Sequence, residues 1–169
     1  KLCHYGASIG IAVATADAAE AVVEDADIAL YEAKRAGRGR FALFTPELRR
    51  SAQERKKMGD DLLKGLGDGE IVVHYQPQTE ARTGRLHGLE ALARWRHPTL
   101  GLLQPARFLP IAEDLGVTAD IDALVLRDSL ACAAALADQG LAVPKVSVNA
   151  STGRLASETL LAELDRLPT

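Results

Sequence analysis

Residues 88–98 read GLEALARWRHP, and they form most of an apolar stretch that predicts a β-strand from Leu86 to Trp95. Because side chains alternate across a strand, Glu90, Leu92 and Arg94 share one face of it. The opposite face is apolar and carries Leu89, Ala91, Ala93 and Trp95. A carboxylate and a guanidinium on one face indicate either a structural ion pair or part of a binding site, and the strand alone leaves both interpretations open.

Predicted strands and helices alternate on both sides of this strand. A strand over Glu70–Gln76 and a turn at residues 82–84 precede it, and the loop HPTLGLLQP at residues 97–105 follows it. The remaining predicted elements are helices over Phe108–Leu115 and Asp120–Asp138, a strand over Lys145–Asn149 and a helix over Ser157–Leu167. Strands separated by helices of this length predict an α/β fold with a parallel sheet or barrel.

The first 45 residues predict a strand, a helix and a second strand. The run ASIGIAVA at residues 7–14 is typical of a strand buried on both faces. We expect the helix to begin at Asp25 as its N-cap and to stop at Gly37. Residues 40–44 then return as a short strand. A sheet of two strands needs neighbours, so we expect this unit to be part of a larger sheet.

A long charged helix is predicted between these two parts. Thr45, Pro46 and Glu47 are the residue types preferred at a helix start. The helix continues to Leu66 with few apolar positions, which favours a connector. We expect the glycines at 65, 67 and 69 to end it and to mark a domain boundary.

Three further polar features are candidates for function. Asn149 ends a predicted strand, where an amide oxygen beside a glutamate suits a hard cation, although a turn cap explains it as well. Gln76 ends another strand before Pro77, which strand termination also explains. Lys34 and Arg38 are four residues apart near a helix end, so both could reach one anion or simply complement the helix dipole.

Composition narrows the classes of function. The chain has 169 residues, 47% of them hydrophobic, and a formal net charge of −3, which is typical of a soluble globular protein and gives no electrostatic case for DNA or RNA. No apolar stretch is long enough to span a membrane, so we expect a cytoplasmic chain. Its two cysteines lie far apart and predict neither a disulfide nor a zinc site.

About 250 residues are typical of a complete eight-stranded α/β barrel, so the chain is too short for one.

Taken together, the motifs resemble a known tandem of domains. DADIALYEAKRAGRGRF at residues 25–41 resembles the C-terminal end of a GGDEF (diguanylate cyclase) domain. VVHYQPQ, GLEALARWRHP, FLPIAEDLG and VSVNAS resemble the first part of an EAL domain, the cyclic di-GMP phosphodiesterase. The resemblance implies a C-terminal piece of a nucleotidyl-cyclase-like sheet at residues 1–45, a connector helix at 46–69, and the first part of a (β/α)₈-type barrel at 70–169.

The resemblance also implies roles for residues. Glu90 and Asn149 match metal ligands for Mg²⁺ or Mn²⁺. Three positions match contacts to cyclic di-GMP: Gln76, Leu92 and Arg94. In the cyclase part, Lys34 and Arg38 match the pair that touches the phosphates of GTP. The implied reaction is hydrolysis of cyclic di-GMP to pGpG, and we expect a homo-oligomer.

The chain departs from the family pattern at both ends. The GGDEF signature is absent, and the later acidic metal ligands, a lysine and a further glutamate of an EAL site would lie beyond Thr169. We therefore expect a fragment without a complete active site, inactive by itself. Two alternatives stay open: a receptor that binds cyclic di-GMP or GTP without turnover, and an inert scaffold piece.

Overall fold

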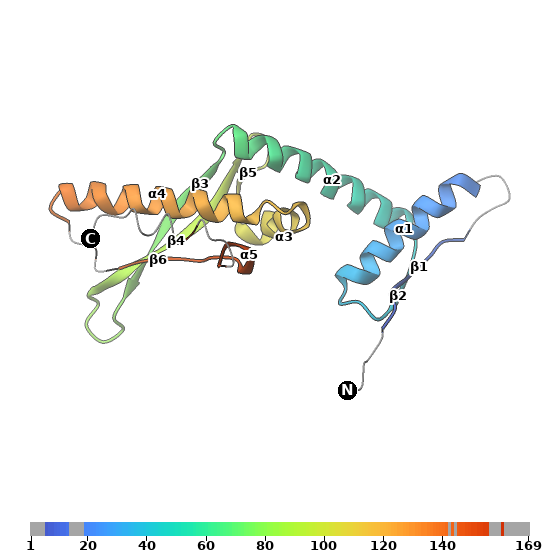
Figure 1. The fold of residues 1–169 in the computed structure, drawn as a ribbon, viewed down its shortest axis with the longest axis horizontal. Coiled ribbons are helices and arrows are strands. Elements are labelled where there is room, and N and C mark those ends of the chain that lie inside the picture. The colour runs from blue at the N-terminus through green and yellow to red at the C-terminus, as the bar shows by residue number, and fades with distance from the viewer. Residues whose placement is uncertain (1–5, 14–18, 142, 144, 156–159, 161–169) are drawn as a thin grey trace. The chain divides into compact units, whose positions relative to one another are not determined.

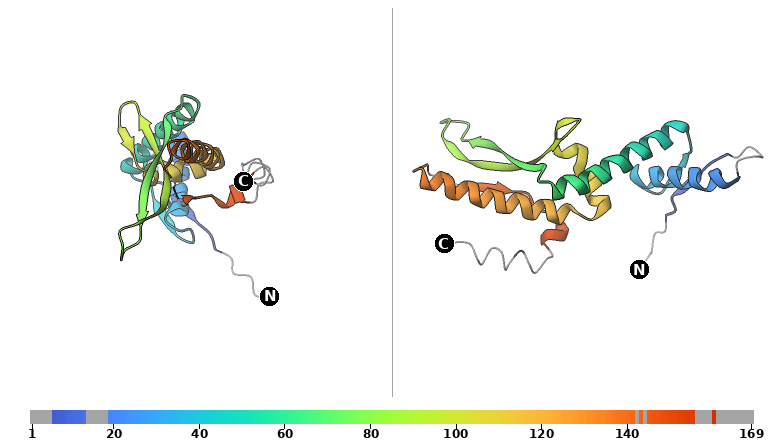
Figure 2. Two further views of the ribbon diagram at one scale, coloured as in Figure 1. Left: turned by 90° about the vertical axis from the view of Figure 1, so that its left-hand side faces the viewer. Right: turned by 90° about the horizontal axis from the view of Figure 1, so that it is seen from above.

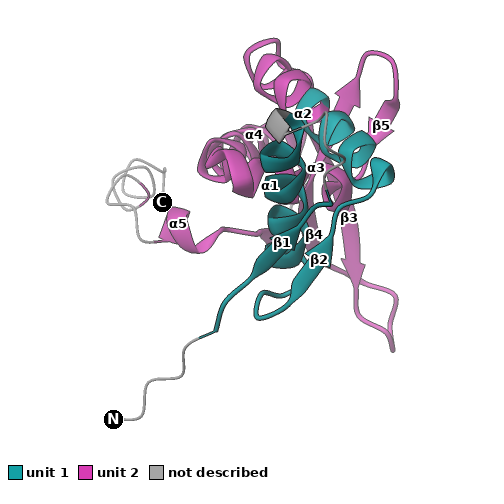
Figure 3. Cartoon of the chain, turned by 90° about the vertical axis from the view of Figure 1, so that its right-hand side faces the viewer, with its two compact units in different colours: residues 1–57 teal, residues 58–169 magenta. Residues whose placement is uncertain are grey.

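A computed structural model describes residues 6–13, 19–141, 143, 145–155 and 160. The chain divides into two compact units, residues 1–57 and 58–169 (Figure 3). The long helix α2, Pro46–Gly67, contributes to both units. Each unit is described by itself below.

Unit 1 contains a parallel pair of strands joined by a helix. Strand β1, Ile9–Ile11, pairs with β2, Phe41–Leu43, and α1, Ala19–Arg35, connects them (Figure 1). Gly10 lies directly under the helix, because a Cβ atom there would meet the Ala26 carbonyl oxygen at 2.0 Å. The predicted burial of β1 on both faces is wrong for this chain: Ile9 is 53% exposed on the face away from α1.

The predicted start of α1 is also wrong. The helix already includes Ala19, so Asp25 lies inside it and does not cap it. The Asp25 carboxylate instead accepts a charged hydrogen bond from Arg49 in the first half of α2. The start of α2 at Pro46 and its end at Gly67, one residue after Leu66 and among the predicted glycines, are both as expected. The chain turns after it, at Gly69, whose φ is +72°.

Unit 2 is organised around one long strand. Strand β4, Leu86–His97, pairs along one edge with the antiparallel strand β3, Ile71–Thr79. Its other edge pairs with β6, Val146–Val148, in parallel and with β5, Gly101–Leu103, in antiparallel orientation. The predicted loop at residues 97–105 therefore contains a short strand. Gly101, with φ of +72°, supplies the left-handed conformation of the reversal that leads into this strand.

Helices cover one face of this sheet. Helix α3, Pro105–Leu115, packs on β4, and α4, Thr118–Asp138, lies along β3, β4 and β6 (Figure 2). Both agree with the predicted helices within a few residues. A short helix α5, Thr152–Leu155, follows β6. Apart from Leu160, the predicted helix over Ser157–Leu167 lies outside the described residues. None of the helices formed by described residues is long and apolar enough to cross a bilayer.

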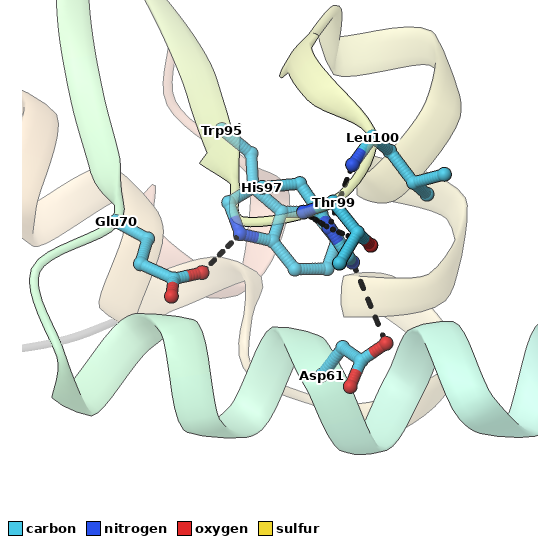
Figure 4. A network of polar contacts seen from close by, with 6 residues as sticks. All are labelled: Asp61, Glu70, Trp95, His97, Thr99 and Leu100. Atoms are coloured by element: carbon cyan, nitrogen blue, oxygen red, sulfur yellow. Dashed lines mark hydrogen bonds and ion pairs between the residues drawn. The ribbon is translucent and has the colours of Figure 1, made fainter.

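Trp95 lies at the centre of the core of unit 2. Its side chain is fully buried and meets the ring of Phe108 edge to face, with the centroids 6.0 Å apart. The indole Nε1 donates a hydrogen bond of 2.9 Å to Glu70 Oε2 (Figure 4). Gly65 of α2 lies so close that a Cβ atom there would be 2.9 Å from this nitrogen. The apolar face predicted for β4 is thus the core face.

His97 is a structural residue, although the sequence indicated only a loop position. It ends β4 and is 5% exposed. Its Nδ1 accepts hydrogen bonds from the backbone N–H groups of Thr99 and Leu100, at 3.2 and 3.3 Å (Figure 4). The ring hydrogen must therefore be on Nε2, which lies 3.4 Å from Asp61 Oδ2 on α2. This cluster joins the second half of α2 to the turn between β4 and β5.

Tyr75 provides a polar contact on the same core face. Its hydroxyl donates a hydrogen bond of 3.1 Å to the backbone oxygen of Asp128 on α4. Burial raises the pKa of the Tyr75 hydroxyl, because the phenolate would lose more solvation than the neutral phenol. Tyr75 thus stays a neutral donor that links β3 to α4.

Replacing Gly88 by Ala is expected to lower the free energy of unfolding by about 1–3 kcal/mol. A Cβ atom at Gly88 would lie 2.7 Å from the backbone oxygen of Lys145, which also accepts the Leu89 N–H at 2.8 Å. The backbone of β6 must move away from β4 to admit it. Chemical denaturation measures the change. Gly67→Ala is the control, since nothing lies within 4 Å of its added methyl group, and an equal loss in both variants would contradict the explanation.

Candidate functional site

The open face of the sheet in unit 2 carries the candidate residues. Gln76 of β3 is the direct partner of Glu90 of β4, and Glu90 is in turn the partner of Ser147 of β6. Directly paired residues direct their side chains to the same face in both ladder types. The core residues Ala91 and Trp95 occupy the other face. The pairing therefore brings three neighbouring strands together at Glu90, on the side away from the helices.

Asn149 joins this group from the carboxyl end of β6. It follows Ser147 by two residues, and its Nδ2 donates a hydrogen bond of 3.2 Å to Glu90 Oε1. Rotation of the amide group exchanges its nitrogen and oxygen, so the same side chain can offer an oxygen to a cation beside the carboxylate. These are hard oxygen donors of the kind that Mg²⁺ and Mn²⁺ prefer. The two residues thus fit a metal site, but they supply only part of the usual six ligands.

No group of three or more His, Cys, Asp and Glu residues that could hold a metal ion occurs within the described ranges. Among these residues Glu90 is therefore not part of a cluster of such side chains.

Leu92 and Arg94 continue the same face of β4 beyond Glu90. Both are half-buried, and their partners on β3 are His74 and Val72. Arg94 Nη1 donates a hydrogen bond of 2.8 Å to the backbone oxygen of Ala93. A guanidinium has five N–H donors, so others stay available for an anion. The face thus presents, in order along β4, a carboxylate, an apolar side chain and a cation.

The predicted helical pairing of Lys34 and Arg38 is wrong. Helix α1 ends at Arg35, and Arg38 lies beyond it with φ of 59°. Its backbone N–H donates to the Ala33 carbonyl at 3.1 Å in the turn that closes the helix. A four-residue spacing places side chains together only inside a helix, so it gives no reason for these two to converge. Both are exposed, and contact with GTP stays a prediction.

The turn after Asn149 has a contact that the sequence did not indicate. The backbone N–H of Ser151 donates a hydrogen bond of 2.8 Å to Asp122 Oδ2 on α4. The two residues are far apart in sequence, and Asp122 alone has no motif that marks it. Its only sequence signal is a polar residue among the apolar positions at the start of a helix.

An open cavity of about 470 Å³ lies beside this turn. It is lined by Glu113, Gly116, Thr118, Ala119, Ser151, Thr152 and Gly153. The volume is within the usual range for small-ligand sites, about 300–1,000 Å³. Glu90 and Asn149 are not among the lining residues, so the cavity is a neighbour of the candidate metal ligands rather than their site.

The EAL domain family matches residues 60–168. The cyclic di-GMP phosphodiesterase PdeR of Escherichia coli K12 is 35% identical over 97% of this chain and 25% of its own length. The bifunctional diguanylate cyclase/cyclic di-GMP phosphodiesterase MucR of Pseudomonas aeruginosa is 36% identical over 94% of this chain and 23% of its own length. The chain thus spans about a quarter of the length of these curated relatives.

A solved structure shares the fold of about two thirds of the chain. The PaMucR phosphodiesterase in complex with c-di-GMP superimposes with a TM-score of 0.61 at 35% identity, over 64% of this chain and 44% of that chain.

Proposed function

Because this chain belongs to the EAL domain family, we propose that the protein of which it is part hydrolyses one phosphodiester bond of cyclic di-GMP to give linear pGpG. The observation that carries the proposal is the hydrogen bond between Asn149 and Glu90, which brings together two oxygen-bearing side chains, one from β4 and one from the residue directly after β6. The names of PdeR and MucR, both of which contain the words cyclic di-GMP phosphodiesterase, support the substrate.

Glu90 and Asn149 are the residues that we propose to hold Mg²⁺ or Mn²⁺. A divalent cation supplies charge that stabilises phosphoryl oxygens, and it acidifies an attacking water. The contribution of this chain is to hold Glu90 on β4 and to place Asn149 beside it, directly after the paired strand β6. Further ligands come from outside the described residues.

The substrate contacts that we propose are Gln76, Leu92 and Arg94. Arg94 is suited to a phosphate of the dinucleotide, because a guanidinium binds anionic oxygens with several parallel N–H groups. Leu92 offers an apolar surface between the guanidinium of Arg94 and the carboxylate of Glu90. Gln76 stands opposite Glu90 on β3, where its amide can donate or accept at the edge of a ligand.

We also propose that residues 1–45 are the C-terminal piece of a GGDEF domain, with residues 46–69 as a connector and 70–169 as the first part of the EAL domain. The similarity to MucR, named as a bifunctional cyclase and phosphodiesterase, covers 94% of the chain and supports this division. The parallel β1–α1–β2 unit is what a piece of such a sheet would contain. Contact of GTP with Lys34 and Arg38, a homo-oligomer and a cytoplasmic location stay predictions.

Turnover of cyclic di-GMP by the full-length protein tests the proposal. We expect pGpG to form in the presence of Mg²⁺ or Mn²⁺, and its formation to stop when EDTA removes the metal, with separation of the nucleotides by chromatography as the measurement. The 169-residue chain alone is expected to show no turnover. Tight binding of the dinucleotide without any hydrolysis by the full-length protein would overturn the proposal and favour a receptor.

A further inference from the structure

The turn between β6 and α5 determines where the Asn149 side chain lies. Asn149 and Ala150 are exposed, so packing against the core does not hold this part of the backbone. Ser151 comes next and is half-buried. The conformation of the turn must therefore be maintained by polar contacts of the backbone.

Ser151 is held from two sides. Toward α5, its Oγ accepts the Arg154 N–H at 3.3 Å and its carbonyl accepts the Leu155 N–H at 3.0 Å, so Ser151 caps this short helix. Toward α4, its own N–H donates to Asp122 Oδ2 at 2.8 Å. The second contact attaches the turn to a helix of 21 residues that packs on three strands of the sheet.

The bond to Asp122 is a strong form of backbone anchor. A hydrogen bond to an ionised carboxylate is about twice as strong as one between neutral groups. Asp122 is half-buried near the start of α4, beside the buried residues Ile121 and Val125 that fix the helix on the core. The acceptor is therefore attached to a rigid element, and β6 and α5 run beside that element (Figure 2).

We propose that Asp122 is a positioning residue for the candidate metal site: by holding the N–H of Ser151, it keeps Asn149 against Glu90. The proposal rests on the proposed function, which gives Asn149 its role as a ligand. Groups that orient metal ligands without touching the metal commonly change metal affinity by about 10–100-fold when they are removed. In this role Asp122 only accepts a hydrogen bond, so an uncharged side chain with an oxygen in the same place should preserve the position of Asn149.

The first experiment measures the position of Asn149 directly and needs no activity. In the isotope-labelled 169-residue chain, nuclear Overhauser effects between the Asn149 side-chain amide and the Glu90 side chain report the hydrogen bond. We expect these effects in the wild type and in Asp122→Asn, whose amide oxygen can accept the Ser151 N–H, and we expect them to vanish in Asp122→Ala. Asp120→Ala is the matched control, because Asp120 is an exposed carboxylate on the same helix.

The second experiment measures the effect on the site in the full-length protein. For Asp122→Ala we expect the metal concentration at half-maximal rate to rise about 10-fold or more. For Asp122→Asn we expect this concentration to stay close to the wild-type value. If Asp122→Ala does not fold, Asp122→Leu, which retains more of the side-chain volume, takes its place.

Two results would overturn the proposal. One is that the nuclear Overhauser effects between Asn149 and Glu90 persist in Asp122→Ala, and the other is that they vanish in Asp122→Asn as fully as in Asp122→Ala. An inactive full-length protein in which these effects still depend on Asp122 would refute the proposed function and leave the positioning role intact.

Discussion

Replacement of Glu90 by Gln in the full-length protein is expected to lower the rate of cyclic di-GMP hydrolysis by at least about 100-fold. Removal of a residue that only orients a metal ligand lowers metal affinity or activity by up to about 100-fold, and loss of the ligand itself should cost at least as much. The substitution preserves the shape of the side chain and removes its charge. A neutral amide binds Mg²⁺ or Mn²⁺ much more weakly than a carboxylate does, because these hard cations prefer charged oxygens. The rate should therefore fall through loss of metal.

The fold should survive this substitution. Glu90 is half-buried, and a Gln oxygen can still accept the hydrogen bond from Asn149. We expect the denaturation midpoint to change little and higher metal concentrations to restore part of the rate. Glu80→Gln is the control, since Glu80 is an exposed carboxylate in the turn that joins β3 to β4. Equal rates for Glu90→Gln and the wild type would remove Glu90 from the site.

The face of the candidate site could be predicted from sequence because it depends on the period of one strand. Alternation along β4 placed Glu90, Leu92 and Arg94 together and Trp95 opposite them, and the structure agrees. That Asn149 lies next to Glu90 needed the parallel pairing of β6 with β4, which no local pattern contains. The resemblance to a family supplied this step.

Features that depend on distant partners were missed for the same reason. Asp25 has the residue type of an N-cap, but its partner is Arg49 on another helix, so local preference gave the wrong helix start. The structural role of His97 depends on the reversal of the chain after it, which brings the backbone N–H groups of Thr99 and Leu100 to its ring. The hydrogen bond of Asp122 likewise joins it to Ser151, which is far away in sequence.

Replacement of Trp95 by Ala is expected to lower the free energy of unfolding of unit 2 by about 3–5 kcal/mol. The side chain is fully buried, and its removal leaves a cavity bordered by Phe108 and by the Glu70 carboxylate, which would also lose its indole donor. A loss of this size is a large part of the total stability of an ordinary domain, about 5–15 kcal/mol. Because Trp95 and Glu90 belong to the same strand, the variant should also weaken the candidate site.

Denaturation of the 169-residue chain, followed by circular dichroism, measures this loss, and Trp95→Phe separates its two causes. Phe retains an aromatic ring against Phe108 but cannot donate to Glu70, so we expect it to lose less stability than Ala does. Leu102→Ala serves as the control, because Leu102 is 48% exposed on β5 and should lose little. If Trp95→Ala were no less stable than Leu102→Ala, then Trp95 could not be the centre of a packed core, and the sheet would lack the support that holds Glu90 beside Asn149.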